Sequence, residues 1–113
     1  MMASTPQFVE FVVEQLNASG QVSAKKMFGE YGLYWSDKLF ALVCDNRLYV
    51  KPTAAGRAFW PAAVEAAPYP GAKPSFLIEE QLEDRQWLAT FARLTVEALP
   101  EPKPKVSKRR TSP

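Results

Sequence analysis

Short links between strand-like segments constrain the fold of this chain more than any other feature of its sequence. Residues 39–44 are apolar on both faces, as in a central strand, and residues 47–51 alternate between apolar and polar side chains. Only Asp45 and Asn46 separate the two segments, and both residue types tolerate positive φ. Because a two-residue link can join only antiparallel neighbours, the sequence predicts a hairpin here.

A second pair of strands precedes this hairpin. Residues 22–28 begin polar and end apolar, and residues 31–35 alternate as a strand requires. Gly29 and Gly32 lie close together in this strand-like sequence, which predicts a bulge or a tight bend. With short polar turns between them, the segments of residues 22–51 predict an antiparallel meander.

Helices are expected on either side of the meander. Thr5 is a good N-cap and Pro6 a good first helical residue, and apolar residues then recur at spacings of three and four as far as Leu16. Gly20 is expected to end this helix in the left-handed region. A second, short helix is predicted over residues 53–59, with Thr53 as its N-cap.

The last third of the chain predicts a loop, a short strand and a long helix. Prolines punctuate residues 61–74, and residues 75–78 form a short apolar run that could add to one edge of the sheet. Acidic residues at 79–84 suit the first turn of a helix, whose apolar face continues to Leu99, where Pro100 stops it.

Together these elements predict an α+β fold with two layers. A mostly antiparallel sheet, with the meander and the short strand, carries the N-terminal and C-terminal helices on one face. Residues 1–99 are expected to form one domain. Residues 100–113, rich in Pro, Lys and Arg, are expected to be a disordered tail.

The composition argues against an enzyme. The chain contains no histidine, the usual proton shuttle and the commonest metal ligand. Its one cysteine, Cys44, lies in an apolar run, which indicates a core thiol in a reducing compartment. The acidic residues Glu79, Glu80, Glu83 and Asp84 are explained by their place at a helix start. We therefore expect no catalytic residue, no cofactor, no metal and no small-molecule substrate.

Targeting signals are not evident either. The N-terminus lacks a basic region followed by an apolar core, and no apolar run approaches the roughly 18 residues that a membrane span needs. A cytoplasmic protein without a membrane partner is expected.

Basic and aromatic side chains mark a candidate surface on the sheet. Arg47, Tyr49 and Lys51 alternate outward along one strand, and Tyr34 could join them across the pairing. The full candidate surface for a partner or a nucleic acid consists of Lys25, Lys26, Tyr34, Arg47, Tyr49 and Lys51. The alternative is an ordinary half-wet face on which the stems of Lys and Arg cover the rings.

The basic excess of the chain belongs to its end. Residues 1–100 carry nine Lys or Arg and eleven Asp or Glu, whereas the last 13 residues carry five basic residues and Glu101. Weak phosphate contacts with DNA are possible through these five residues, which are Lys103, Lys105, Lys108, Arg109 and Arg110. A solubilising tail explains them equally well.

The order of these segments resembles a known family. The run from Lys25 to Tyr34, with Met27-Phe28-Gly29 and Tyr31-Gly32-Leu33 at its centre, and the later Leu48-Tyr49-Val50-Lys51 are together similar to the N-terminal domain of the TfoX/Sxy family. These bacterial proteins are linked to natural competence.

The resemblance covers roughly residues 6–99 and implies a two-layer α/β domain. It also implies a non-enzymatic role in transcription regulation, through a regulator protein or DNA, with no catalytic residues to carry over. Full-length competence regulators of the family have a second, helical domain, and this chain looks like the stand-alone form. The alternative function is a small, chaperone-like homodimer that binds proteins and not nucleic acids.

Overall fold

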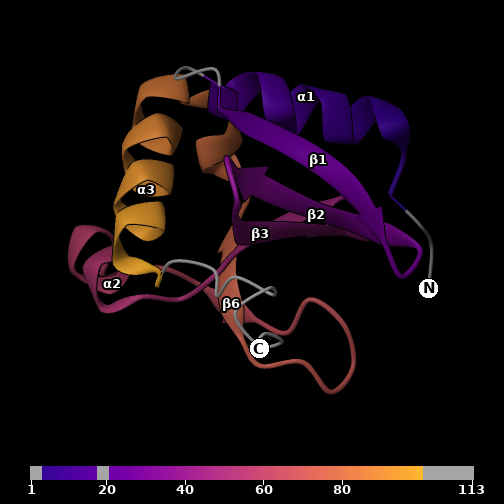
Figure 1. The fold of residues 1–113 in the computed structure, drawn as a ribbon. Helices are drawn as coiled ribbons and strands as arrows, with labels where there is room; N and C mark the ends of the chain where they lie inside the picture. Colours follow the sequence, from indigo (N-terminus) through magenta and orange to yellow (C-terminus); the bar gives the residue numbers. More distant parts are fainter. Residues whose placement is uncertain (1–3, 18–20, 101–113) are drawn as a thin grey trace, which may run out of the picture.

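The computed structural model describes residues 4–17 and 21–100, and it shows one six-stranded antiparallel sheet with helices packed against it (Figure 1). The strand order is β1-β2-β3-β4-β6-β5. The strands are β1 (Val22–Met27), β2 (Glu30–Trp35), β3 (Lys38–Cys44), β4 (Arg47–Val50), β5 (Glu65–Ala66) and β6 (Ser75–Ile78). The helices are α1 (Pro6–Leu16), α2 (Ala54–Phe59) and α3 (Arg85–Ala98), with a 3-10 helix over Glu80–Glu83.

The predicted meander is confirmed. Each of the first four strands pairs antiparallel with the next, and two-residue turns join them. Asp45 and Asn46, in the β3–β4 turn, both have positive φ, at 54° and 56°. Such turns have the twist that neighbouring strands need, which is why a short link between apolar runs predicted the hairpin correctly.

The two glycines of the second hairpin have different roles. Gly29 lies in the β1–β2 turn with φ of 82°, a conformation that favours glycine. Gly32 lies in regular β2, so the prediction of a bend at this position is wrong. The sheet is irregular one pair later, where Leu33 pairs with Ala41 and Tyr34 with Leu39, leaving Phe40 as the extra residue of a bulge in β3.

The short strand over residues 75–78 joins the sheet as predicted, but it does not lie at its edge. β6 pairs with β4 on one side and with the two-residue β5 on the other. The backbone N–H of Leu77 also donates to the carbonyl of Val64, at 2.8 Å. Sequence analysis missed β5 because two residues are too few to show a period.

The N-terminal helix begins where its cap predicted. The Thr5 hydroxyl accepts a hydrogen bond from the Phe8 N–H at 3.2 Å, and Pro6 is the first helical residue. Gln15, buried on the inner face, donates to the Leu82 carbonyl at 2.7 Å and accepts from Arg85 Nε at 2.9 Å. These bonds connect α1 to the start of α3. The predicted stop at Gly20 lies outside the described residues.

The C-terminal helix begins later than predicted. The acidic residues at 79–83 do not form its first turn, because four of the residues there wind as the separate 3-10 helix. Asp84 is the N-cap of α3, and its side chain accepts from the Trp87 N–H at 3.1 Å. The acidic side chains therefore precede α3, and Asp84 is the one that satisfies a helical N–H.

A single core lies between the helices and one face of the sheet. The alternate residues of β2, β3, β4 and β6 that point to this face join the buried side chains of α1 and α3. The largest fully buried members are Phe40, Phe76, Phe91, Leu16, Leu33, Leu48, Ile78 and Leu88. The α+β class and the layering predicted from the sequence are confirmed.

Among the residues that the structure describes, no helix combines the length and the apolar character needed to cross a bilayer. The tail that the sequence predicted to be disordered, from residue 101 onward, lies outside the described residues.

Candidate functional site

The face of the sheet that points away from the core carries most of the predicted site. We call it the second face. Its basic and aromatic side chains are Lys25, Tyr34, Arg47, Tyr49 and Lys51, and its aliphatic ones include Met27, Leu39, Leu42 and Leu77. The register places these residues together because Ser23 pairs with Tyr34, Leu42 with Tyr49, and Tyr49 with Leu77.

The predicted residues differ in how much surface they offer. Arg47 and Lys25 are exposed, and the Lys25 ammonium lies 5.1 Å from the centre of the Tyr34 ring, within range of a cation–π contact. Tyr49 is only 4% exposed, and its partners on the neighbouring strands are Leu42 and Leu77. Tyr49 therefore lies on the predicted face, but its ring offers little surface to a partner.

Lys26 does not share the second face. It pairs with Tyr31, whose side chain packs against the core, so alternation places Lys26 on the helix side of β1. Its side chain is exposed because β1 is the outermost strand. The adjacent lysines therefore lie on opposite faces of β1, although the predicted surface included both of them.

Gly32 shapes the second face. A Cβ atom at this position would lie 2.9 Å from Met27 Sδ and 3.0 Å from Leu39 Cδ1. The side chains of Met27 and Leu39 therefore pack over Gly32 from the neighbouring strands. This close approach, and not a bend, is the physical reason for a glycine here.

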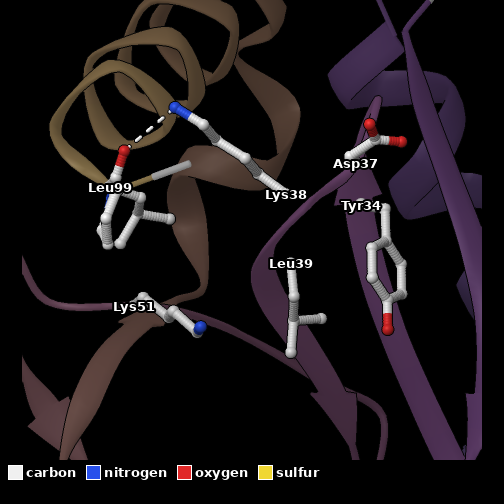
Figure 2. A pocket seen from close by; sticks show the side chains of 7 residues that line it. Tyr34, Asp37, Lys38, Leu39, Lys51 and Leu99 are labelled. Carbon is white, nitrogen blue, oxygen red and sulfur yellow. Dashed lines mark hydrogen bonds between the residues drawn. The ribbon is translucent and has the colours of Figure 1, made fainter. Parts of the chain in front are cut away.

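A pocket of about 290 Å³ opens at the end of the sheet beside the C-terminus of α3 (Figure 2). Tyr34 and Leu39 line it from the strands, Lys51 lines it from just after β4, and Leu99 lines it from the end of α3. Lys38 donates from Nζ to the carbonyls of Val96 and Leu99, both at 2.9 Å, and so caps α3. The polar groups of the pocket lining thus include the ammonium groups of Lys38 and Lys51 and the carboxylate of Asp37.

The opposite end of the sheet is held by one carboxylate. Glu30 accepts from the backbone N–H of Ser4 at 3.0 Å and from that of Asp45 at 2.9 Å. Asn46 adds to this junction, because its side chain accepts from the Thr5 N–H at 2.9 Å. These bonds fix both hairpin turns and the start of α1 relative to one another.

Phe28 lies at the same end of the sheet, in the β1–β2 turn. Its side chain is 102% exposed, the largest value among the large hydrophobic residues, and its φ is +51°. A bulky residue in the left-handed region is a backbone outlier, and here no burial of the ring offsets the strain. Tyr31 and Trp35, the aromatic residues that follow on β2, pack against the core, whereas the Phe28 ring does not.

We expect Phe28→Asn to raise the free energy of unfolding by about 1 kcal/mol, because Asn tolerates the left-handed region and Asn-Gly is the favoured sequence for such a turn. Urea unfolding at low protein concentration measures it. Phe28→Ala is the control, since it removes the ring and keeps the strained backbone, so it should change stability by less than about 0.5 kcal/mol. Equal gains from both variants would refute the backbone explanation.

Cys44 has no reactive environment. Its thiol is buried, and burial, followed by the charges of Glu30 and Asp45, raises the thiol pKa from 9.0 to about 11. At neutral pH the sulfur is therefore protonated and a poor nucleophile. Within residues 4–17 and 21–100, no three His, Cys, Asp or Glu side chains gather as a metal site would require.

The comparison with known families decides the identity of the fold. The family model for the TfoX N-terminal domain matches residues 14–99. The chain belongs to the TfoX N-terminal domain family. A relative from Spirochaeta aurantia, described as an uncharacterized 12.7 kDa protein in the trpE 5′ region, is 39% identical over 110 residues, which cover 97% of this chain and 96% of the relative.

The match to the TfoX N-terminal domain confirms the resemblance seen in the sequence. It assigns no role to individual side chains. The exposure of Phe28 was not predicted, although the sequence carries one signal for it. Phe28 directly precedes Gly29 in the two-residue link between two strand-like segments, so it must lie in the turn. The predicted tail contacts, Lys103 to Arg110, lie outside the described residues.

Proposed function

We propose that this TfoX N-terminal domain is a regulatory binding module that acts by docking a partner protein on the second face of its sheet. The observation that carries the proposal is the composition of that face. Exposed Arg47 and Lys25 and half-buried Lys51 surround partly exposed Tyr34 and Leu42. A mixture of aliphatic area, an aromatic ring and a basic rim suits a protein partner with an acidic border.

The proposed function is non-enzymatic. The chain contains no histidine, and its one thiol is buried and protonated at neutral pH. In this proposal the process is transcription regulation and the partner is a cytoplasmic regulator, as the resemblance to the TfoX/Sxy family implies. Direct DNA binding, in which the basic residues from Lys103 onward contact phosphates, is a second component of the proposal and is tested separately.

Charge reversal on the second face tests the docking surface. We expect Arg47→Glu to lower the recovery of transcription regulators with the full chain, in quantitative affinity enrichment from its own cells, by about tenfold or more. Arg93→Glu is the matched control, because Arg93 is an exposed residue of α3 and the charge change is the same. Identical enrichment with both variants and the unaltered chain would refute docking on this face.

Titration of labelled duplex DNA at low salt tests the second component. We expect the full chain to bind and a chain ending at Leu99 to bind at least tenfold more weakly, because the described part carries more acidic than basic residues. If neither chain binds, direct DNA contact is excluded. If both bind equally, the folded domain and not the basic segment is the DNA-binding part.

A further inference from the structure

A groove lies between helix α1 and strand β1, on the helix side of the sheet, and we call it the α1–β1 groove. Its volume is about 730 Å³, and Val9, Val13 and Ala24 line its apolar part. Glu10 and Glu14 of α1 form its acidic rim. Because β1 pairs only with β2, no other strand of the described chain covers this edge of the sheet.

The two carboxylates of the rim have no counter-charge. Glu10 and Glu14 are exposed and form no ion pair among the residues that the structure describes. They are four positions apart on α1, a spacing at which like charges repel and destabilise a helix. Lys26, two residues beyond Ala24 on β1, is not part of the groove lining. The α1–β1 groove therefore favours an occupant that brings an apolar side chain and two cations about 5–6 Å apart.

The end of the described chain lies near this groove. Lys38 Nζ donates to the Leu99 carbonyl at 2.9 Å (Figure 2). Lys38 pairs with Trp35, and Trp35 pairs with Val22 at the start of β1. Adjacent strands are about 4.8 Å apart, so with the lysine side chain Val22 lies within roughly 20 Å of Leu99. The Val22 N–H donates to the Asn17 side chain at 3.1 Å, so the C-terminal end of α1 lies at the same place.

The chain beyond Leu99 has the length and the residues that the groove requires. An extended chain spans about 3.3 Å per residue, so the stretch from Leu99 to Val106 can cover about 23 Å. Residues 105–110, which we call the tail segment, contain no proline. Val106, Lys108 and Arg110 alternate along this segment, and in any extended chain such residues share one side, about 6.6 Å apart. This spacing is close to that of the two carboxylates on α1.

We propose that the tail segment docks, extended, in the α1–β1 groove of its own molecule. The segment enters where α1 ends and β1 begins, and Val106 occupies the apolar part of the groove. Lys108 then lies beside Glu14, and Arg110 lies beside Glu10. Docking within one molecule is favoured over docking between molecules, because a short tether gives an effective concentration in the millimolar range.

Exposed carboxylates on a helix are ordinarily solvated, and single surface ion pairs are weak. The distribution of charge favours docking, because residues 1–100 carry two more acidic than basic residues and the last 13 carry four more basic than acidic ones. Docking also occupies cations that would otherwise contact phosphates, so the groove and DNA compete for them. The inference goes beyond the proposed function, since docking is measured without a partner protein or DNA.

A nitroxide label in the full-length variant Ser112→Cys tests the docking by nuclear magnetic resonance. Cys44 is buried and its pKa is about 11, so the new thiol reacts selectively. The groove signals are the methyl groups of Val9, Val13 and Ala24, and the reference signals on the second face are those of Leu42 and Leu77. We expect the groove signals to broaden about threefold more than the reference signals, because the tether keeps the label at the groove.

Two outcomes of this measurement count against the proposal. Equal broadening of the groove and reference signals overturns it. A mixture of isotope-labelled chains without nitroxide and unlabelled chains with nitroxide identifies contacts between molecules, and we expect no broadening in it. Broadening found only in this mixture refutes docking within one molecule.

Paired charge reversals test the arrangement of the tail segment. We expect Lys108→Glu/Arg110→Glu to reduce the broadening of the groove signals about threefold or more, because both cations that face the carboxylates become like charges. Lys105→Glu/Arg109→Glu is the matched control. It makes the same charge change on the other side of the extended segment, so it should reduce the broadening by less than about half. Equal losses in the two variants contradict the alternating arrangement.

Exchange of the charges across the contact provides a rescue. Adding Glu10→Lys and Glu14→Lys to the variant Lys108→Glu/Arg110→Glu should restore the broadening, because each pair again joins opposite charges. Both glutamates are exposed, so the fold should be kept, and circular dichroism checks this. A folded chain with exchanged charges that does not regain the broadening refutes the pairing of the tail segment with α1.

Discussion

Phe91→Ala is expected to lower the free energy of unfolding by about 3–5 kcal/mol, the cost of removing a buried phenylalanine. Phe91 is 1% exposed and contacts four other rings of the core. It stacks on Trp87 at 4.9 Å between centroids, and lies 5.6 Å from Phe76, 5.7 Å from Trp60 and 6.0 Å from Phe59. These rings come from α2 and the residue that follows it, from α3 and from β6, so one deletion loosens three elements.

Urea unfolding followed by tryptophan fluorescence measures this loss, since Trp60 and Trp87 both border the ring. Phe59→Ala is the matched control. Phe59 belongs to the same cluster but is 38% exposed, so its removal should cost about half as much or less. A loss at Phe91 no larger than that at Phe59 would show that the cluster does not stabilise the fold as its burial indicates.

Gly56→Val is expected to destabilise by about 3 kcal/mol, even though glycine is a poor residue inside a helix. A Cβ atom at Gly56 would lie 2.9 Å from Cε2 of Phe76 and 3.4 Å from Cε1 of Phe91. Both rings are fully buried and cannot swing away into solvent. Steric overlap therefore outweighs the gain in helix propensity, and Gly56→Ala should show a smaller loss of the same sign.

Ala58→Val is the control for the valine, because Ala58 is an exposed residue of the same short helix. It should cost about 0.5 kcal/mol or less, from helix propensity alone. The double variant Gly56→Val/Phe91→Ala should be less destabilised than the two losses added together, because the deleted ring makes room for Phe76 to move. Strict additivity would refute direct packing of α2 on these rings.

Local signals predicted the hairpins and the caps correctly. Asp45-Asn46 between two apolar runs required an antiparallel turn, and Thr5 and Thr53 cap α1 and α2 through their hydroxyls as expected. The start of α3 was misplaced because a run of acidic residues suits both a first helical turn and a 3-10 helix before it. The hydrogen bond from the Trp87 N–H to the Asp84 side chain shows that α3 begins only after the 3-10 helix.

The candidate site was only partly predictable. Strand alternation placed Arg47, Tyr49 and Lys51 on one face, and the register adds Lys25 and Tyr34. Alternation did not show how deeply Tyr49 would be buried, nor that Lys26 would lie on the helix side of β1. These properties depend on which strands are adjacent, which is a long-range property of the sheet.

The sequence by itself determined the strand order of the meander, the helix starts at Pro6 and Ala54, and membership of the TfoX N-terminal domain family, because each depends on residues close together in the chain. Tertiary structure alone decided that Tyr49 is almost fully buried, that Gly56 must be a glycine, and that β1 is an edge strand beside an acidic groove. Exposure, steric fit and unpaired strand edges arise from contacts between distant segments, and no local pattern encodes them.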